Sequence, residues 1–229
     1  MIYITGDTHR DFDRILEFCD AIGTSQEEDV MIVLGDAGIN YYLNREDVYF
    51  KLELSAYPIT FFFVHGNHEE RPNLIDTYEE DTWNGGTVYV EEDYPNLIFA
   101  KDGEIYDLDG KKAIVIGGAY SVDKFSRDKD TWFESEQPDD YTMACVEQQL
   151  DSVDWTINYV LTHTVPLKYE PTEVFLPNIN QEIVDKTTEK WLDRIEDKLK
   201  YDRWFAGHYH YDTRIDRLTI MYMEIEDLL

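Results

Sequence analysis

Short apolar runs alternate with longer amphipathic stretches along the first third of the chain. The runs cover residues 1–6, 30–34 and 59–64, and a glycine ends each run or follows it within two positions. Helical spacing of apolar residues predicts a helix through about Ile22 and a second helix over 46–56. Buried strands separated by helix-length segments are typical of βαβ units, so this part predicts a parallel sheet covered on both faces.

The pattern changes over the middle of the chain. Short β-forming stretches at 88–90, 97–99, 104–106 and 112–116 are separated by turn residues. Because closely spaced strands joined by turns usually pair in opposite directions, we expect an antiparallel group of strands here.

The remaining chain returns to strands and helices around a long irregular loop. Its expected elements are helices near 142–153 and over 184–199, and strands at 157–161, 204–206, 213–216 and 218–224. Three prolines over residues 166–177 disfavour regular structure there, and a loop of this length is usually functional. We therefore expect one domain over residues 1–229, with about 119–153 and 164–182 as lid or substrate-specificity segments.

The composition is that of a globular protein. The 229 residues are 43% hydrophobic and 14% aromatic, which is enough to bury a core. The best apolar run, Ile59 to Val64, is too short to span a bilayer, so no membrane partner is expected. The N-terminus lacks a basic region and a cleavage site, so we expect it to be retained. Cys19 and Cys145 form no Cys-x-x-Cys pair, and we expect reduced thiols and a cytoplasmic location.

The net charge of −29 narrows the range of partners. Lysine and arginine form no dense stripe, and a strongly acidic chain repels other polyanions. Long nucleic acid is therefore disfavoured as a partner, whereas a small or exposed phosphate ester is compatible with the charge. The oligomeric state stays open.

Five segments place oxygen or nitrogen side chains after these apolar runs. They are Gly6-Asp7-Thr8-His9, Gly35-Asp36-Ala37-Gly38, Gly66-Asn67-His68-Glu69, Thr162-His163-Thr164 and Gly207-His208-Tyr209-His210. Five of the six histidines in the chain lie in these segments. Because parallel strands bring their carboxyl ends to one edge of a sheet, these side chains are expected to converge.

The converging side chains are candidate metal ligands. They are Asp7, His9, Asp36, Asn67, His163, His208 and His210. Carboxylates can bridge two cations, and imidazoles suit manganese, iron, zinc or nickel better than magnesium. Two such cations can polarise a phosphoryl group and supply hydroxide at neutral pH. Taken singly, Asp7 and Asp36 could instead cap helices, Asn67 could be a turn residue, and His163 could be a core histidine.

The order of the five motifs resembles the calcineurin-like metallophosphoesterase superfamily. The motifs that carry the resemblance are Asp-x-His, Gly-Asp, Gly-Asn-His-Glu, a single histidine after a strand, and Gly-His-x-His, from Asp7 to His210. The resemblance implies the α/β class, as a four-layer α/β/β/α sandwich with a central lid-like insertion. It also implies phosphoester hydrolysis by a hydroxide that bridges two metal ions.

The resemblance implies a role for each motif residue. One metal ion would be held by Asp7, His9, Asp36 and His210, and the second by Asp36, Asn67, His163 and His208. Asp36 would thus bridge the two ions and serve in catalysis, and His68 would protonate the leaving oxygen. Manganese is the preferred expectation for both ions, with iron, zinc or nickel as alternatives.

Two departures from the family pattern concern phosphate binding. Protein phosphatases on this scaffold carry an arginine after the Gly-Asp motif and another before Gly-Asn-His-Glu. Here the first arginine is missing and His65 occupies the second position, which disfavours a protein serine/threonine phosphatase. The basic residues that could bind phosphate instead are Arg10, Lys124 and Arg127, together with Arg71 and Lys168.

The sequence therefore predicts an enzyme, a metal-dependent phosphoesterase that acts on a small or exposed phosphate ester. A phosphodiesterase or nuclease acting on nucleotides is an alternative, because the same metals serve that chemistry. A non-catalytic scaffold with the same fold is a second alternative, although such a protein would be expected to lose ligands or His68.

Overall fold

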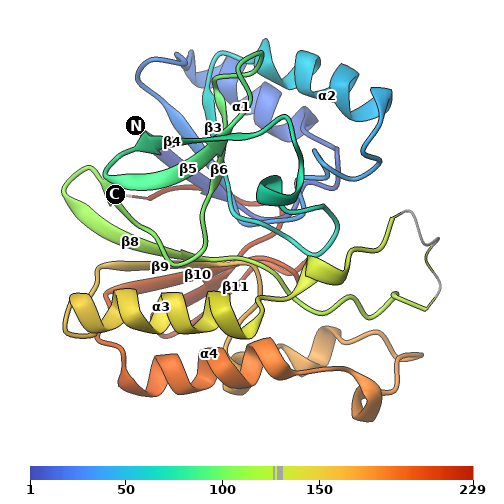
Figure 1. Ribbon diagram of the computed structural model, residues 1–229, viewed down its shortest axis with the longest axis vertical. Helices are drawn as coiled ribbons and strands as arrows, with labels where there is room; N and C mark the ends of the chain where they lie inside the picture. The colour runs from blue at the N-terminus through green and yellow to red at the C-terminus, as the bar shows by residue number, and fades with distance from the viewer. Residues whose placement is uncertain (126, 128–130, 229) are drawn as a thin grey trace.

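The computed structural model describes residues 1–125, 127 and 131–228. Two mixed β-sheets face each other, and two helices cover the outer face of each sheet (Figure 1). The fold is therefore the predicted four-layer α/β/β/α sandwich.

The first sheet contains the parallel strands expected from the N-terminal apolar runs. Its order is β13 (Ile225–Asp227), β1 (Ile2–Thr5), β2 (Val30–Val33), β3 (Thr60–Phe63), β6 (Leu97–Ala100), β5 (Gly86–Val90) and β4 (Glu79–Trp83). Strands β1, β2, β3 and β6 run parallel, and antiparallel strands flank them on both sides.

The second sheet is built from the middle and the C-terminal part of the chain. Its order is β11 (Thr213–Ile215), β12 (Leu218–Ile220), β10 (Arg203–Ala206), β9 (Tyr159–Thr162), β8 (Lys111–Ile116) and β7 (Ile105–Leu108). The four inner strands are parallel, and each edge strand is antiparallel to its neighbour.

Helices form the two outer layers. They are α1 (Asp13–Ile22) and α2 (Arg45–Ser55) on the first sheet, and α3 (Asp140–Ser152) and α4 (Thr187–Lys198) on the second. Short 3₁₀ turns occur at Pro72–Leu74, Glu134–Glu136, Leu167–Tyr169, Thr172–Val174 and Gln181–Ile183. No helix among the described residues combines the length and hydropathy needed to cross a bilayer.

Alternation along the strands divides the apolar residues into separate cores. In β2 and β3, Ile32 and Phe62 face the space between the sheets, whereas Met31, Phe61 and Phe63 face α1 and α2. Successive side chains of a strand point to opposite faces, so a continuous apolar run supplies both cores at once. A third core lies between the second sheet and its helices.

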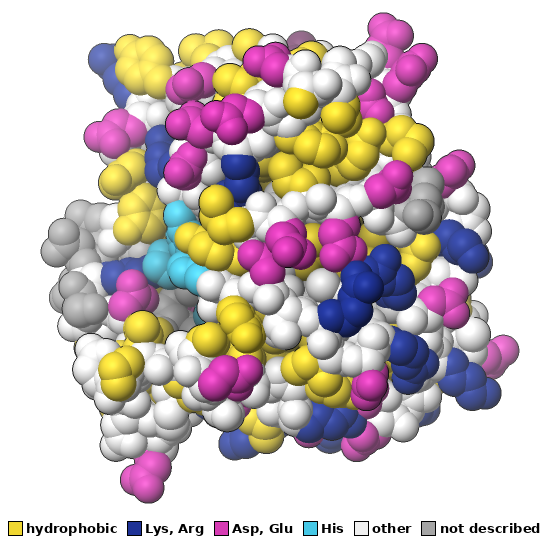
Figure 2. Space-filling view, turned by 180° about the vertical axis from the view of Figure 1, so that it is seen from behind, with side chains coloured by type: hydrophobic (Ala, Val, Ile, Leu, Met, Phe, Trp, Pro, Cys, Tyr) yellow, Lys and Arg dark blue, Asp and Glu magenta, His cyan; other side chains and the backbone are white. Residues whose placement is uncertain are grey.

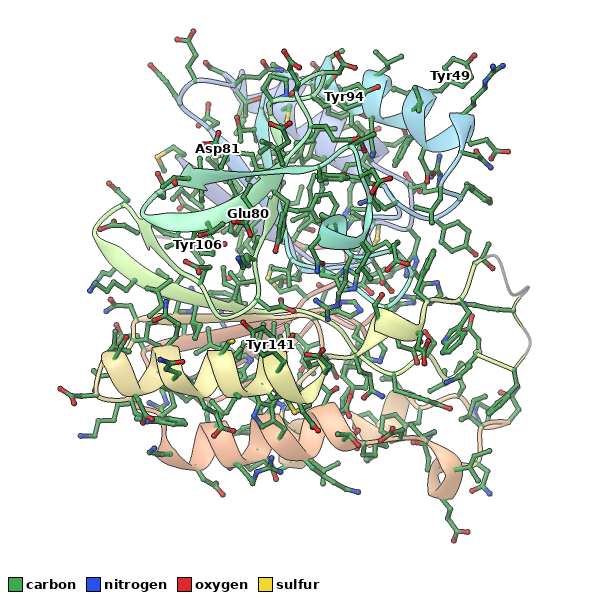
Figure 3. The ribbon with its side chains drawn as sticks, viewed as in Figure 1. Tyr49, Glu80, Asp81, Tyr94, Tyr106 and Tyr141 are labelled. Carbon is green, nitrogen blue, oxygen red and sulfur yellow. The ribbon has the colours of Figure 1, made fainter. Side chains whose placement is uncertain are left out.

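Tyr106 of β7 connects the two sheets. Its hydroxyl donates a hydrogen bond to the carbonyl oxygen of Thr87 in β5 (2.6 Å) and accepts one from the amide of Lys101 (2.9 Å). Its ring lies 4.9 Å from that of Phe62. Figure 3 shows Tyr106 between the sheets, whereas Tyr49 lies on the outer side of α2 and is 67% exposed.

The prediction of one antiparallel group in the middle of the chain is wrong. The four strands are divided, with β5 and β6 in the first sheet and β7 and β8 in the second. The sequential pairs β5–β6 and β7–β8 are antiparallel, but β6 pairs parallel with β3, and β8 pairs parallel with β9. A local pattern identifies a strand without identifying its distant partner. Strands β4 and β13 were not predicted.

The segment expected as a lid, 119–153, has two parts. Its second half forms α3, which packs under the second sheet through Val146 and Leu150 and is a layer of the fold. In its first half, Tyr120, Val122 and Asp123 line a cavity, and residues 126 and 128–130 lie outside the described part of the chain. The loop over 164–182 contains bends, two complete 3₁₀ turns and the start of a third, Gln181–Ile183.

Candidate metal centre

Ligand-bearing loops from both sheets meet at one edge of the sandwich. Asp7 follows β1, Asp36 follows β2 and Asn67 follows β3 in the first sheet, while His163 follows β9 and His208 follows β10 in the second. The site lies outside the carboxyl ends of parallel strands, where α/β sheets usually bind ligands.

Asp7, His9 and His210 form the first group of converging ligand atoms. The Nε2 atoms of His9 and His210 are 2.8 Å apart, and Nε2 of His210 is 3.3 Å from Oδ2 of Asp7. This Oδ2 atom is fully buried and has no hydrogen-bond partner among the described residues. A buried carboxylate oxygen without a donor, surrounded by imidazole nitrogens, fits a site for a cation.

The side chains of Asn67 and His163 converge at a second point. Nε2 of His163 is 2.8 Å from Oδ1 of Asn67 and 3.5 Å from Oδ1 of Asp36. The other imidazole nitrogen of His163 lies 2.7 Å from the carbonyl oxygen of Leu34, to which it donates. Ser121 accepts from the Asn67 amide nitrogen at 2.9 Å. The hydrogen bonds to Leu34 and Ser121 direct the imidazole Nε2 and the amide oxygen toward the same space.

Asp36 lies between these two groups of side chains. Its Oδ2 atom is 3.7 Å from Nε2 of His9, and Asp36 shares one group of converging ligand atoms with Asp7 and His163. It shares another with His9 and His68. The nitrogen and oxygen donors here suit divalent transition metals, so the residues present fit the implied ions.

The structure holds His208 by its backbone. Its amide donates to Oδ1 of Asp7 at 2.8 Å, and its ring centroid lies 5.0 Å from that of His163. The three groups of converging histidine and acidic ligand atoms among the described residues do not include His208. All seven predicted ligands thus occupy one edge of the fold, and His208 stands slightly apart from the densest part.

Several ligand residues adopt left-handed backbone conformations. The φ angles of His9, Asp36, His208 and His210 are 45°, 50°, 71° and 49°. This region costs a residue other than glycine about 1 kcal/mol or more. Four such residues at one edge of the fold support a functional site, because the surrounding structure must hold them there.

Glycines permit the close approach of the ligand loops. A Cβ atom on Gly66 would lie 2.1 Å from Oδ1 of Asp36, and one on Gly35 would lie 2.2 Å from Nδ1 of His163. Both distances are far below van der Waals contact. Gly35 and Gly66 therefore each leave room for a predicted ligand from another motif.

Burial and mutual charge set the protonation of these groups. Burial raises the pKa of Asp7 and Asp36, but neighbouring histidines outweigh it and lower both pKa values below the usual range. Burial lowers the pKa of His163, but Asp36 and Asp7 outweigh it and raise the value to about 9. Burial, reinforced by His163, lowers the pKa of His208 to about 3. A proton on His163 must therefore leave before this ring can coordinate a metal.

Comparison with known proteins identifies the family. The family model described as "Calcineurin-like phosphoesterase" matches residues 1–212 of the chain. The chain belongs to the calcineurin-like phosphoesterase family. Membership indicates metal-dependent phosphoester hydrolysis, and the family generally binds divalent metals. No curated protein matches the chain.

Solved structures are similar at low sequence identity. One crystal structure is 14% identical with a TM-score of 0.50, over 96% of this chain and 88% of that chain. A phosphopantetheinyl hydrolase, PptH from Mycobacterium tuberculosis, is 16% identical with a TM-score of 0.46, over 96% and 87%. A protein of unknown function from Aquifex aeolicus, AQ665, is 16% identical with a TM-score of 0.35, over 74% and 81%. The first likeness supports the fold alone.

His68 lies beside the ligand groups of this calcineurin-like phosphoesterase. Its Nε2 atom is 3.9 Å from Oδ2 of Asp36, and its side chain is 25% exposed. The guanidinium group of Arg127 contacts both ring nitrogens. Burial is the main cause of a lowered pKa for His68; the charge of Asp36 opposes it and that of Arg127 adds to it. The ring thus lies between a carboxylate of the site and a fixed cation.

The basic residues considered for phosphate binding differ in their surroundings. Arg10 pairs with Asp47 (2.6 Å) and lies over the ring of Phe50. Lys124 lies 4.0 Å from the ring centroid of Trp132. Arg71 pairs with Asp102, and Lys168 with Glu196 and Asp197. Arg127 pairs with Asp123 (2.9 Å) and is the candidate in contact with His68. Phosphate binding by any of these residues stays a prediction.

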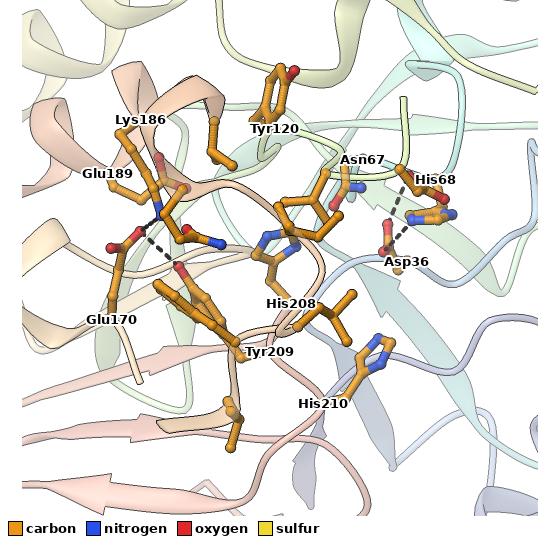
Figure 4. A pocket seen from close by; sticks show the side chains of 18 of the residues that line it. Asp36, Asn67, His68, Tyr120, Glu170, Lys186, Glu189, His208, Tyr209 and His210 are labelled. Atoms are coloured by element: carbon orange, nitrogen blue, oxygen red, sulfur yellow. Dashed lines mark hydrogen bonds and ion pairs between the residues drawn. The ribbon is translucent and has the colours of Figure 1, made fainter. Parts of the chain in front are cut away.

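A cavity of about 450 Å³ extends from the ligand groups into the fold. His9 is among the residues that line it. Others are Asp36, Asn67, His68 and His208 (Figure 4). Histidine side chains reach the surface together beside hydrophobic side chains (Figure 2). The arrangement can therefore admit a ligand from solvent to the candidate metal centre.

Sequence reasoning missed several residues around the centre. They are Ser121, Glu170, Glu189 and Tyr209. Tyr209 stands between two predicted ligands, and that position could have drawn attention to it. Glu170 and Glu189 carried no comparable signal, because a glutamate in a loop or on a helix is usually exposed to solvent.

Proposed function

We propose that this protein is a phosphoesterase that hydrolyses a phosphate ester with two divalent transition-metal ions. The observation that carries the proposal is that seven predicted oxygen and nitrogen ligands lie together at one edge of the sandwich. The buried Oδ2 atom of Asp7 supports it further, because it has no hydrogen bond within the described residues and lies 3.3 Å from Nε2 of His210, a setting that suits a cation shared by the two side chains.

We assign the ligands as the family resemblance implies. Asp7, His9, Asp36 and His210 would hold one ion, and Asp36, Asn67, His163 and His208 the other. Bound ions of this kind polarise the phosphoryl group and lower the pKa of water. Manganese is our preferred metal.

The protein's own residues would orient the ester and move the proton. His68, which lies beside Asp36, would donate a proton to the departing oxygen. Arg127, which contacts His68, would stabilise negative charge on the phosphate. The segments 119–139 and 164–182 would restrict access and select the substrate.

Hydrolysis and metal content together test this function. The purified protein should retain or take up two transition-metal ions per chain, and a chelator should abolish hydrolysis until manganese is restored. A comparison of p-nitrophenyl phosphate with bis-p-nitrophenyl phosphate separates monoester from diester chemistry. A protein that binds no metal and hydrolyses neither ester would refute the proposal.

A further inference from the structure

The cavity continues beyond the metal centre into an apolar chamber. Its walls come largely from the loop after β9, and its lining there includes Val174, Phe175, Leu176, Ile179 and Val184. Tyr120 and Val122 line it from another segment. A phosphate bound at the ligand groups would need only a small part of about 450 Å³, so room remains for an apolar group attached to it.

The far end of this chamber is polar. Nζ of Lys186 lies 2.6 Å from Oε1 of Glu170, and the hydroxyl of Tyr209 lies 3.5 Å from the same oxygen. Oγ1 of Thr164 donates to Oε1 of Glu189 at 2.9 Å. Figure 4 shows Lys186, Glu170 and Glu189 on one side of the cavity and Asp36 and His68 on the other, with His208 between them.

One atom of this polar end lacks a partner. Glu189 is 3% exposed and lines the cavity, yet its Oε2 atom has no hydrogen bond within the described part of the chain. Burial is the main cause of its pKa being raised to about 7. A buried carboxylate oxygen without a donor is costly, and Glu189 lines the cavity, so a ligand bound in the cavity is a candidate source of that donor.

The charges at this end favour the same kind of ligand. Glu170 is paired with Lys186, so Glu189 leaves an excess of one negative charge when it is ionised. A hydroxyl, an amide N–H or an ammonium group would satisfy it, whereas a second carboxylate would be repelled.

We propose that the cavity selects phosphate esters whose alcohol part is an apolar chain or ring with a hydrogen-bond donor at its far end. The phosphate would lie at the metal centre, the apolar part against Phe175 and Ile179, and the donor on Oε2 of Glu189. The assignment of the phosphate end rests on the proposed function. Glu189 is then a specificity-determining residue remote from the reacting atoms.

A series of synthetic esters tests this selectivity. Alkyl phosphates from propyl to octyl are compared with ω-hydroxyalkyl and ω-aminoalkyl phosphates of the same lengths, with manganese present. At the chain length that fits, a donor-bearing ester should have a kcat/KM at least about tenfold above its alkyl counterpart, as one hydrogen bond permits. Glu189→Gln keeps Oε1 for Thr164 but replaces Oε2 with an amide nitrogen, and should remove most of this preference.

A matched variant and a binding measurement complete the test. Glu182→Gln makes the same change at an exposed position, in the 3₁₀ turn that precedes α4, and should leave the preference intact. Binding of the corresponding diols and amino alcohols, followed by ligand-observed NMR, should weaken in Glu189→Gln. Donor-dependent binding without hydrolysis of any ester would refute the proposed function but support this pocket. Hydrolysis with no donor preference at any length, unchanged in Glu189→Gln, would overturn the pocket assignment.

Discussion

At the scale of single residues, a substitution of His68 separates its proposed role in proton transfer from metal binding by the neighbouring residues. Replacement by alanine should lower kcat by about two to four orders of magnitude, the usual contribution of a general acid. The loss should be greater for an alkyl phosphate than for p-nitrophenyl phosphate, because the nitrophenolate leaves without a proton. Metal content, measured by elemental analysis, should not change. Equal rates for His68→Ala and the unmodified protein would show that another group supplies the proton.

A glycine next to a ligand offers a second test at this scale. Alanine at Gly35 would place a methyl group 2.2 Å from Nδ1 of His163, so metal binding should fall sharply. Gly85 is a suitable control, because its φ of +86° is close to the +95° of Gly35 and nothing lies within 4 Å of its Cβ position. Both variants place alanine at a similar positive φ, and only the first displaces His163. Equal metal content in the two variants would contradict the role of His163.

At the scale of elements, helix α4 carries a buried acid whose titration should affect stability. Glu189 faces Thr164, Glu170, Lys186 and Tyr209. Burial raises its pKa from the ordinary 4.5 to about 7 in the folded protein. Between pH 4.5 and pH 7 the Glu189 carboxyl group is therefore protonated in the folded state and ionised in the unfolded state. The contribution of Glu189 to the free energy of unfolding is therefore fully present below about pH 4.5 and is lost as the pH rises toward 7.

The expected effect follows from that difference in pKa. The two pKa values of Glu189 differ by about 2.5, and this difference corresponds to roughly 3 kcal/mol of unfolding free energy. Glu189→Gln should remove this decline, so its stability advantage over the unmodified protein should grow from pH 4.5 to 7. Urea unfolding at several pH values measures it, with the exposed Glu182→Gln as control. Parallel pH profiles for all three proteins would contradict the buried state of Glu189.

The elements also show what a local pattern can predict. Strands β1, β2 and β3 follow from continuous apolar runs, and their parallel pairing follows from the helices between them. The distribution of β5 to β8 over two sheets could not be predicted in this way, because pairing depends on distant strands. Strand β4 was missed because four of its five residues are exposed and polar or charged.

At the scale of the whole molecule, the candidate centre was more predictable than the substrate cavity. Each ligand motif is short and follows a strand, so convergence at one edge could be expected from topology alone. The cavity depends on a loop without regular structure and on helix α4, and on which glutamate of that helix is buried. Glu189 is buried and its neighbour Lys190 is exposed, because the two lie at different places on the helix surface.

The central claim is that both sheets contribute ligands to a pair of metal ions. Anomalous diffraction from crystals grown with manganese measures this directly, because it locates each ion without assuming its ligands. The account predicts two peaks about 3.5–4 Å apart on either side of Asp36, one near Asp7, His9 and His210 and the other near Asn67, His163 and His208. A single peak, or none at this edge of the sandwich, would contradict it.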